Sequence, residues 1–153
     1  AKLFAAAAEI GAVVSDRPIQ EQRTLEAFGD HLGMAFQLID DVLDYSAQQT
    51  TLGKAVGDDF RDGKITLPIV LSFRAGDEKE RAFWRRTLED LEQKKGDFKR
   101  AVQYLENTGA QIATVERARE YSRKALDSLS IFPDSEHKQA LTEAAKFAVE
   151  RSY

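Results

Sequence analysis

Apolar residues recur at intervals of three and four along nearly the whole chain, and no stretch alternates strictly between apolar and polar residues. Apolar positions three and four apart lie on one face of an α-helix, whereas strict alternation is typical of a half-buried strand. The pattern therefore predicts an all-α protein. The expected helices span residues 2–15, 20–47, 64–75, 78–95, 97–107, 110–131 and 134–151.

Glycine and proline residues stand where most of these helices are expected to end. The largest interruption is the stretch 53–63, which begins and ends with glycine. Pro68 falls in the first turns of the helix that follows, where a missing amide hydrogen costs little. No apolar run approaches the ~18 residues that a membrane-spanning helix needs.

The chain opens in the middle of a helical pattern, since Ala1-Lys2-Leu3-Phe4 already has the helical spacing and no Met precedes it. An alanine-rich start can indicate a signal peptide, but here Glu9 interrupts the apolar run and no basic region comes before it. We therefore expect these residues to be a piece of a longer protein.

The amino-acid composition argues against several classes of binding partner and of metal site. The 153 residues are 42% hydrophobic and 31% charged, which is typical of a folded helical protein and argues against disorder. The net charge of -4 disfavours non-specific binding to nucleic acid or to anionic membranes. The absence of Cys and the presence of only two His exclude thiolate catalysis and disfavour Cys or His metal clusters. Any metal must be held by carboxylates, which favours a hard cation such as Mg²⁺.

Segment 29–45 combines an acidic stripe with an otherwise apolar surface. When it is wound at ~100° per residue, its polar and small residues fall within a narrow arc. These residues are Asp30, Gly33, Gln37, Asp40, Asp41 and Asp44. A surface helix has a much wider polar face. We therefore expect this helix to be buried on most sides, with its acidic stripe along an internal cavity.

The acidic stripe needs positive charge nearby, because Asp40 and Asp44 are one helical turn apart and repel each other. A divalent cation can satisfy both carboxylates, directly or through bound water. Lys and Arg side chains from a neighbouring helix could do so as well. The spacing favours the metal, and both interpretations stay open.

Segment 51–68 has the features of an anion-binding loop. Glycine directly precedes Lys54 and Lys64, so the backbone can approach an anion closely while the ammonium supplies charge. The helix expected to begin near Lys64 would add the free amide hydrogens of its N-terminus. The spacing does not fit a P-loop, and Phe60 and Ile69 occupy ligand positions of an EF-hand. Carboxylates followed closely by lysines suit a site for a metal and a diphosphate.

These residues also carry a resemblance. Phe36-Gln37-Leu38-Ile39-Asp40-Asp41-Val42-Leu43-Asp44 resembles the second aspartate-rich motif of the trans-type isoprenyl diphosphate synthases, the polyprenyl synthetase family. The Gly53-Lys54-x-x-Gly57-x-Asp59 and Gly63-Lys64-x-Thr66-Leu67-Pro68 segments resemble that family in order and spacing. The residues of these segments most resemble those of the long-chain octaprenyl and decaprenyl diphosphate synthases. Over residues 1–153 the chain resembles only the C-terminal half of the family's domain, without its first aspartate-rich motif.

The resemblance implies the C-terminal half of an isoprenoid-synthase helical bundle and the following site. Asp40, Asp41, Asp44 and Asp59 would hold Mg²⁺ or order its surroundings. Lys54 and Lys64 would bind the substrate diphosphate. Gln37, Asp40 and Lys54 would be the catalytic residues, with the Gln37 carbonyl near the reacting carbons.

The resemblance further implies a Mg²⁺-dependent prenyltransferase that joins isopentenyl diphosphate head-to-tail to an allylic diphosphate, for quinone side chains. It implies a cytoplasmic homodimer with no nucleic-acid partner. A class I terpene cyclase and a non-catalytic helical subunit of a prenyltransferase remain as alternatives. Because the first aspartate-rich motif is missing, we expect the chain alone not to turn over.

Overall fold

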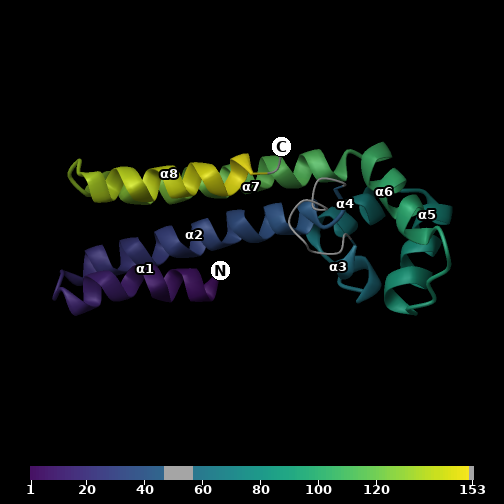
Figure 1. The fold of residues 1–153 in the computed structure, drawn as a ribbon, viewed down its shortest axis with the longest axis horizontal. Coiled ribbons are helices and arrows are strands. Elements are labelled where there is room, and N and C mark those ends of the chain that lie inside the picture. The colour runs from purple at the N-terminus through teal and green to yellow at the C-terminus, as the bar shows by residue number, and fades with distance from the viewer. Residues whose placement is uncertain (47–56, 152–153) are drawn as a thin grey trace. The chain divides into compact units, whose positions relative to one another are not determined.

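A computed structural model describes the fold of residues 1–46 and 57–151. Both ranges are helical and free of strands, which confirms the all-α expectation. In chain order the elements are α1 (Lys2–Val14), α2 (Ile19–Leu43), α3 (Asp58–Arg61), α4 (Leu67–Ala75), α5 (Glu78–Trp84), the π-helical turn η2 (Arg85–Glu89), α6 (Asp97–Asn107), α7 (Ala110–Ser128), the 3₁₀ turn η3 (Leu129–Ile131) and α8 (Glu136–Glu150) (Figure 1). No helix in these ranges is both long and apolar enough to cross a membrane.

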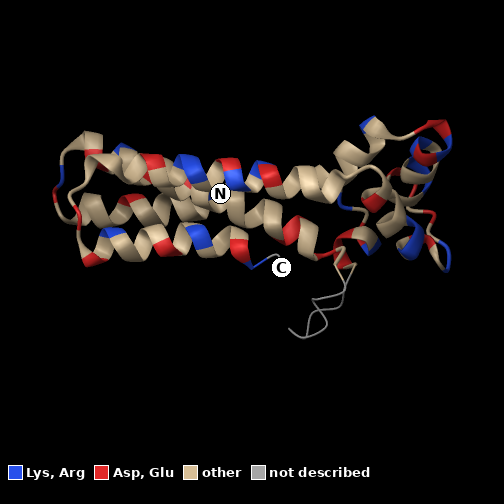
Figure 2. Ribbon diagram, turned by 90° about the horizontal axis from the view of Figure 1, so that it is seen from above, with Lys and Arg blue, Asp and Glu red and all other residues tan. Residues whose placement is uncertain are grey.

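The chain divides into two compact units. The first unit consists of residues 1–39 and 116–153, and the second unit of residues 40–115. The boundaries therefore fall inside α2 and α7. Acidic and basic residues are interspersed along the helices of the first unit (Figure 2).

The helices of the first unit pack around a small apolar core. This core consists of the buried residues Phe28, Ala125, Leu129 and Ala145. Two glycines of α2 allow α1 to approach closely. A Cβ atom on Gly29 would overlap the backbone of Phe4, and one on Gly33 would lie 2.6 Å from the Cα atom of Ala1. Gly33, expected in the polar arc, is therefore buried against α1.

The C-terminal half of α2 is buried on most sides, as the apolar surface of segment 29–45 predicts. The inner residues of α2 are nearly inaccessible to solvent, among them Phe28, Ala35, Leu38, Ile39, Val42 and Leu43. The burial of these side chains removes apolar surface from water and holds the helix in place. Asp41 and Asp44, at the end of this helix, are buried with these apolar residues.

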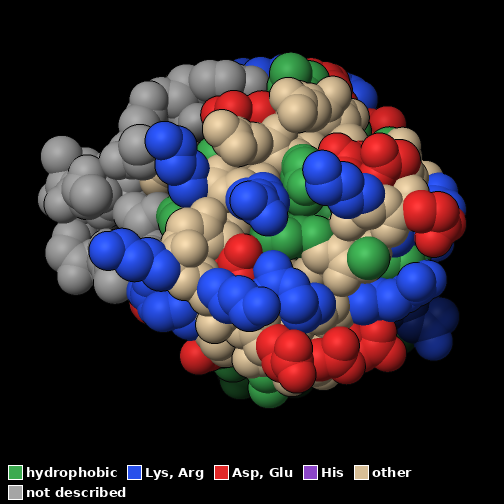
Figure 3. All heavy atoms as spheres, turned by 90° about the vertical axis from the view of Figure 1, so that its right-hand side faces the viewer, with side chains coloured by type: hydrophobic (Ala, Val, Ile, Leu, Met, Phe, Trp, Pro, Cys, Tyr) green, Lys and Arg blue, Asp and Glu red, His purple; other side chains and the backbone are tan. Residues whose placement is uncertain are grey.

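The second unit packs around an aromatic core. Trp84 and Phe83 are buried, and both meet the ring of Tyr104 edge-to-face, with centroid distances of 6.2 and 5.1 Å. Trp84 thus packs in the core, as its apolar neighbours predict. On the surface of this unit is an apolar hollow bordered by Arg74 and Arg85, and Figure 3 shows basic side chains around apolar atoms on this face.

The helix expected over 78–95 is shorter in the structure. Its regular part ends at Trp84, a π-helical turn continues to Glu89, and Leu91 then has φ of +56°. A side chain in the left-handed region breaks the helical path, and a π-turn marks an inserted residue in a helix. The amphipathic spacing continues past the break, so periodicity alone missed the helix end.

A partly buried ion pair fixes the start of α6. The Arg86 guanidinium donates to Oδ2 of Asp97 at 2.9 Å, and the backbone amide of Lys94 donates to the same oxygen at 2.8 Å. Asp97 is 5% exposed. The hydrogen bond from Arg86, followed by that from Lys94, holds the pKa of the Asp97 carboxyl below its usual value.

Replacing Asp97 by Asn is expected to lower the free energy of unfolding by about 2 kcal/mol at pH 7, because a charged hydrogen-bond network is lost. Since the pKa of the Asp97 carboxyl is lowered by folding, its contribution is present above the unfolded pKa, about 3.9, and is lost as the pH falls through the folded value. Urea unfolding of both proteins from pH 7 toward pH 3 measures this. A difference that stays constant over that range would contradict the assignment.

Candidate active site

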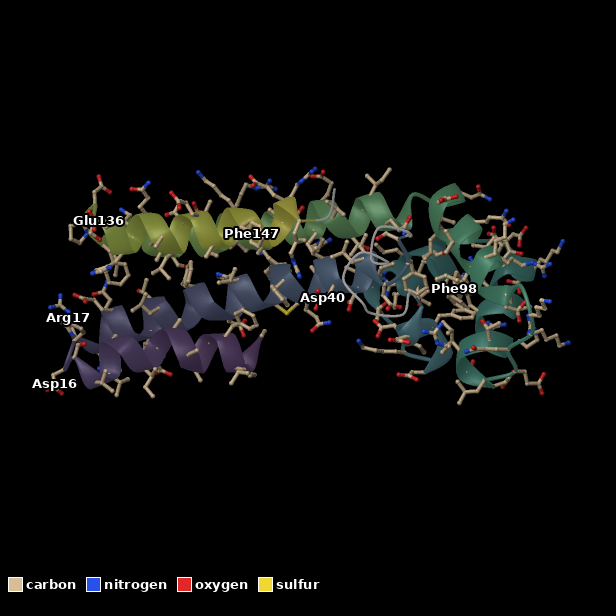
Figure 4. The ribbon with its side chains drawn as sticks, viewed as in Figure 1. Asp16, Arg17, Asp40, Phe98, Glu136 and Phe147 are labelled. Carbon is tan, nitrogen blue, oxygen red and sulfur yellow. The ribbon has the colours of Figure 1, made fainter. Side chains whose placement is uncertain are left out.

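The acidic residues of the motif lie at the C-terminal end of α2. The helix ends at Leu43 and not at residue 47, so Asp40 and Asp41 occupy its last turn and Asp44 lies just beyond it (Asp40 is labelled in Figure 4). The backbone amide of Asp44 still donates to the Asp40 carbonyl at 3.1 Å. Asp40 and Asp44 therefore remain one helical turn apart, as their spacing predicts.

Asp44 is joined by hydrogen bonds to residues 57–59, the first residues that the structure describes after residue 46. The amide of Gly57 donates to the Asp44 carbonyl at 2.9 Å, and the amide of Asp59 donates to Oδ2 of Asp44 at 3.0 Å. Residues 57–59, here called the Asp44-binding turn, are the N-cap glycine and the first two residues of the short helix α3. Gly57 has φ of +84°, which an L side chain rarely adopts, so glycine is needed for this geometry. Helix α3 was not expected from the sequence.

Lys64 forms an ion pair with Asp59 of the Asp44-binding turn. Its Nζ atom lies 3.1 Å from both carboxylate oxygens of Asp59, and its amide donates to the Asp59 carbonyl at 2.8 Å. The hydrogen bond to Asp59 raises the pKa of Lys64, with further contributions from the charges of Asp59, Asp41 and Asp44. Lys64 is therefore a stable cation facing several carboxylates.

The carboxylates of the site are buried close to one another, which is electrostatically unfavourable. Asp41 and Asp44 are 7% and 8% exposed. Burial is the largest cause that raises the pKa of Asp44, and the charges of Asp59 and Asp58 raise it further, while backbone hydrogen bonds from these two residues lower it. Burial and the charges of Asp44, Asp59 and Asp41 also raise the pKa of Tyr45. A cation near these carboxylates would relieve the repulsion.

The remaining predicted residues have different surroundings. Gln37 lies on α2 in the first unit with an exposed side chain, and Asp40 is partly buried. Lys54 lies outside the described residues. The expectation that a helix begins near Lys64 is wrong, because α4 begins at Leu67 with Thr66 as its N-cap. Lys64 therefore lies three residues before the first helical residue of α4, Leu67.

The donors present suit Mg²⁺. Within residues 1–46 and 57–151, no three His, Asp or Glu side chains converge closely enough to form a complete metal cage. Mg²⁺ does not require one, since proteins commonly bind it through one or two carboxylates while waters and substrate phosphates complete the shell. The carboxylates at the end of α2 can supply that partial set. Lys64 pairs with Asp59, which lies outside the acidic stripe of 29–45, so this ion pair is distinct from the helix-borne basic partner considered for that stripe.

One contact near the motif was not anticipated. Arg151, at the end of α8, donates from Nη2 to the carbonyl of Phe36 at 3.0 Å, and its guanidinium carbon lies 3.8 Å from the centre of the Phe36 ring. Phe36 directly precedes Gln37, so the last turn of α8 supports the beginning of the motif. These residues are far apart in the chain, and no local pattern indicates their contact.

Comparisons with known proteins identify the family of this chain. The polyprenyl synthetase family model matches residues 1–105. The octaprenyl diphosphate synthase of Haemophilus influenzae is 39% identical over all 153 residues, which correspond to 46% of its length. A crystal structure of a Caulobacter crescentus polyprenyl synthase complexed with calcium and isoprenyl diphosphate is 44% identical, with a TM-score of 0.92, over 99% of this chain and 46% of that one. A decaprenyl diphosphate synthase from Rhodobacter capsulatus is 37% identical with a TM-score of 0.85, over 97% of this chain and 45% of that one.

The chain thus spans about half the length of the relatives that it matches. The match includes the acidic end of α2 and the Asp44-binding turn, and the helices have the all-α arrangement of the polyprenyl synthases. The chain belongs to the polyprenyl synthetase family.

Proposed function

We propose that this chain, together with the N-terminal half that its relatives contain, catalyses head-to-tail prenyl transfer. The substrates are isopentenyl diphosphate and an allylic diphosphate, and the product is a long-chain polyprenyl diphosphate for quinone side chains. The similarity to octaprenyl and decaprenyl diphosphate synthases supports this product class. The cytoplasmic location and the homodimer implied by the resemblance remain predictions.

The observation that carries the proposal is the connection of Asp44, the Asp44-binding turn and Lys64. Asp44 accepts a hydrogen bond from the amide of Asp59, and the carboxylate of Asp59 holds Lys64. The arrangement therefore gathers carboxylates and an ammonium at one helix end. Carboxylates suit a divalent cation and the ammonium suits a phosphate oxygen, so together they suit a metal diphosphate.

The carboxylates of Asp40, Asp41 and Asp44 would hold Mg²⁺ directly or through water, and Asp59 would order the turn beside them. When bound, Mg²⁺ neutralises charge on the diphosphate and makes it a better leaving group. Because Asp41 and Asp44 are already buried, the ion would replace repulsion between fixed charges with attraction.

Lys64 and Lys54 would bind the diphosphate oxygens and hold the leaving group as its bond to the allylic carbon breaks. Gln37 would direct its carbonyl dipole toward the allylic cation that results. The double bond of isopentenyl diphosphate attacks this cation, and loss of a proton then gives a product that is five carbons longer. The chain's own contribution is to orient the diphosphate and to stabilise charge in place.

The test is a chimaera in which these 153 residues replace the aligned 46% of the Haemophilus influenzae octaprenyl diphosphate synthase. The folded chimaera is expected to elongate an allylic diphosphate with radiolabelled isopentenyl diphosphate in the presence of Mg²⁺. Chromatography of the dephosphorylated products identifies their length. Circular dichroism and size-exclusion chromatography establish that the chimaera is folded.

The 153-residue chain alone is the control, and it is expected to give no prenyl transfer. A folded chimaera that makes no elongated product would contradict the proposal. Products formed without isopentenyl diphosphate would identify a cyclase instead. Turnover by the chain alone would show that the missing half is dispensable.

A further inference from the structure

Phe98, on the first turn of α6, lies directly against the Asp44-binding turn. A Cβ atom built on Gly57 would lie 2.5 Å from Cε2 of the Phe98 ring, and its two other nearest atoms also belong to that ring. The ring thus fills the space beside the Gly57 backbone (Phe98 is labelled in Figure 4). None of the sequence motifs includes Phe98.

The same ring contacts the residues that flank the acidic groups. The Tyr45 ring stacks on Phe98 with a centroid distance of 6.0 Å and an interplanar angle of 21°. The Phe60 ring meets Phe98 edge-on at 5.8 Å and 61°. Tyr45 follows Asp44, and Phe60 follows Asp59. The Phe98 side chain therefore contacts the residue that follows Asp44 and the residue that follows Asp59, the two aspartates joined by the hydrogen bond.

Packing holds these rings in place. Tyr45 is 2% exposed, and its hydroxyl has no hydrogen-bond partner in the described part of the chain. A buried hydroxyl without a partner adds no directional restraint, so the position of Tyr45 depends on ring contacts. Phe60 is buried as well. The orientation of both residues thus depends on where Phe98 lies.

The position of Phe98 is itself fixed by its neighbour. Asp97 accepts hydrogen bonds from Arg86 at 2.9 Å and from the Lys94 amide at 2.8 Å. These bonds anchor the first turn of α6, from which the Phe98 ring projects. A continuous set of contacts therefore runs from the Arg86–Asp97 ion pair through the Phe98 ring to the acidic site.

We propose that Phe98 is a positioning residue, which holds the Asp44-binding turn in register with Asp44 by wedging between Gly57, Tyr45 and Phe60. Helix α6 thereby controls the geometry of the acidic site without contributing a polar group to it. The hydrogen bond from the Asp59 amide to Asp44 is the interaction that the wedge preserves. The catalytic consequence of this role rests on the proposed prenyl transfer, whereas the structural role does not.

The experiment compares two identical substitutions in the same core, Phe98→Leu and Phe83→Leu, in the 153-residue chain. Phe83 is the matched control because its ring meets Trp84 and Tyr104. Amide hydrogen exchange is measured by NMR for Gly57 and Asp59 and for the slowest amides of α6. The slowest amides report global unfolding, and the turn amides report local opening.

Phe98→Leu is expected to accelerate amide exchange at Gly57 and Asp59 and at the slowest α6 amides to different extents. The acceleration at Gly57 and Asp59 is expected to be the larger of the two, by about tenfold, because the turn opens locally. Phe83→Leu is expected to accelerate both groups of amides in the same proportion. Phe98→Tyr keeps the ring and is expected to retain the slow exchange of the turn. If Phe98→Leu and Phe83→Leu change the two groups of amides equally, Phe98 is an ordinary core residue and the inference is wrong.

The effect of Phe98 on prenyl transfer is measured separately, in the chimaera. Phe98→Leu is expected to raise the Mg²⁺ concentration that gives half-maximal rate by about tenfold more than Phe83→Leu does, because misplaced carboxylates bind the ion less well. An equal Mg²⁺ requirement in the two variants would overturn this consequence. Failure of the unmodified chimaera would count against the proposed function, while the exchange result would still decide the structural role.

Discussion

Replacing Asp40 by Ala in the chimaera is expected to lower kcat for prenyl transfer by about 10²- to 10³-fold, as loss of a group that stabilises transition-state charge commonly does. Asp40 occupies the last turn of α2 and is partly buried, so water cannot take over its position freely. Steady-state rates with radiolabelled isopentenyl diphosphate, measured at several Mg²⁺ concentrations, test the expectation. Excess Mg²⁺ is expected to restore only part of the rate.

Asp127→Ala is the control for this substitution. Asp127 lies exposed on α7, away from the motif in the chain, so its removal deletes one surface charge and leaves the acidic end of α2 intact. Its expected effect on kcat is less than about threefold, because isolated surface charges contribute little. Near-normal turnover by Asp40→Ala would rule out a role for this carboxylate in the reaction.

Periodicity predicted the helical class and most helix positions, because those helices bury one continuous apolar face. The expected helix 97–107 matches α6 within its bounds, and the range 2–15 matches α1 closely. The acidic arc was also visible, since Asp40 and Asp44 are neighbours through the geometry of the helix itself. Local spacing carries such information directly.

Features that depend on residues distant in the chain were not predictable in this way. The π-turn before Leu91 leaves the amphipathic spacing intact, so the expected helix ran past its end. The contact between Arg151 and Phe36 joins residues from α8 and α2. The wedge of Phe98 against Gly57 is similar, because only tertiary packing brings α6 to the turn. Motif spacing predicted which residues form the candidate site, and packing determines how they are held.

Gly57→Ala is expected to disable the site even though it adds only one methyl group. Gly57 has φ of +84°, and its new Cβ would lie 2.5 Å from the Phe98 ring. The left-handed backbone costs an L residue roughly 1–2 kcal/mol, and the overlap adds to that cost. We expect the turn to shift, so that the amides of Gly57 and Asp59 no longer reach Asp44. A displacement of about 1 Å can lower a rate by about 10²-fold, and kcat of the chimaera is expected to fall to that extent.

Gly11→Ala provides the comparison, because it makes the same chemical change in a different backbone setting. Gly11 lies within α1, and a Cβ there would meet nothing within 4 Å. Alanine in a helix interior is favoured over glycine by roughly 0.5–1 kcal/mol, so this variant is expected to gain stability and keep its kcat. Urea unfolding should therefore show a loss of stability for Gly57→Ala and a gain for Gly11→Ala, and steady-state rates should fall for Gly57→Ala alone. If Gly57→Ala kept both its stability and its rate, the Asp44-binding turn could not be what holds the acidic site together.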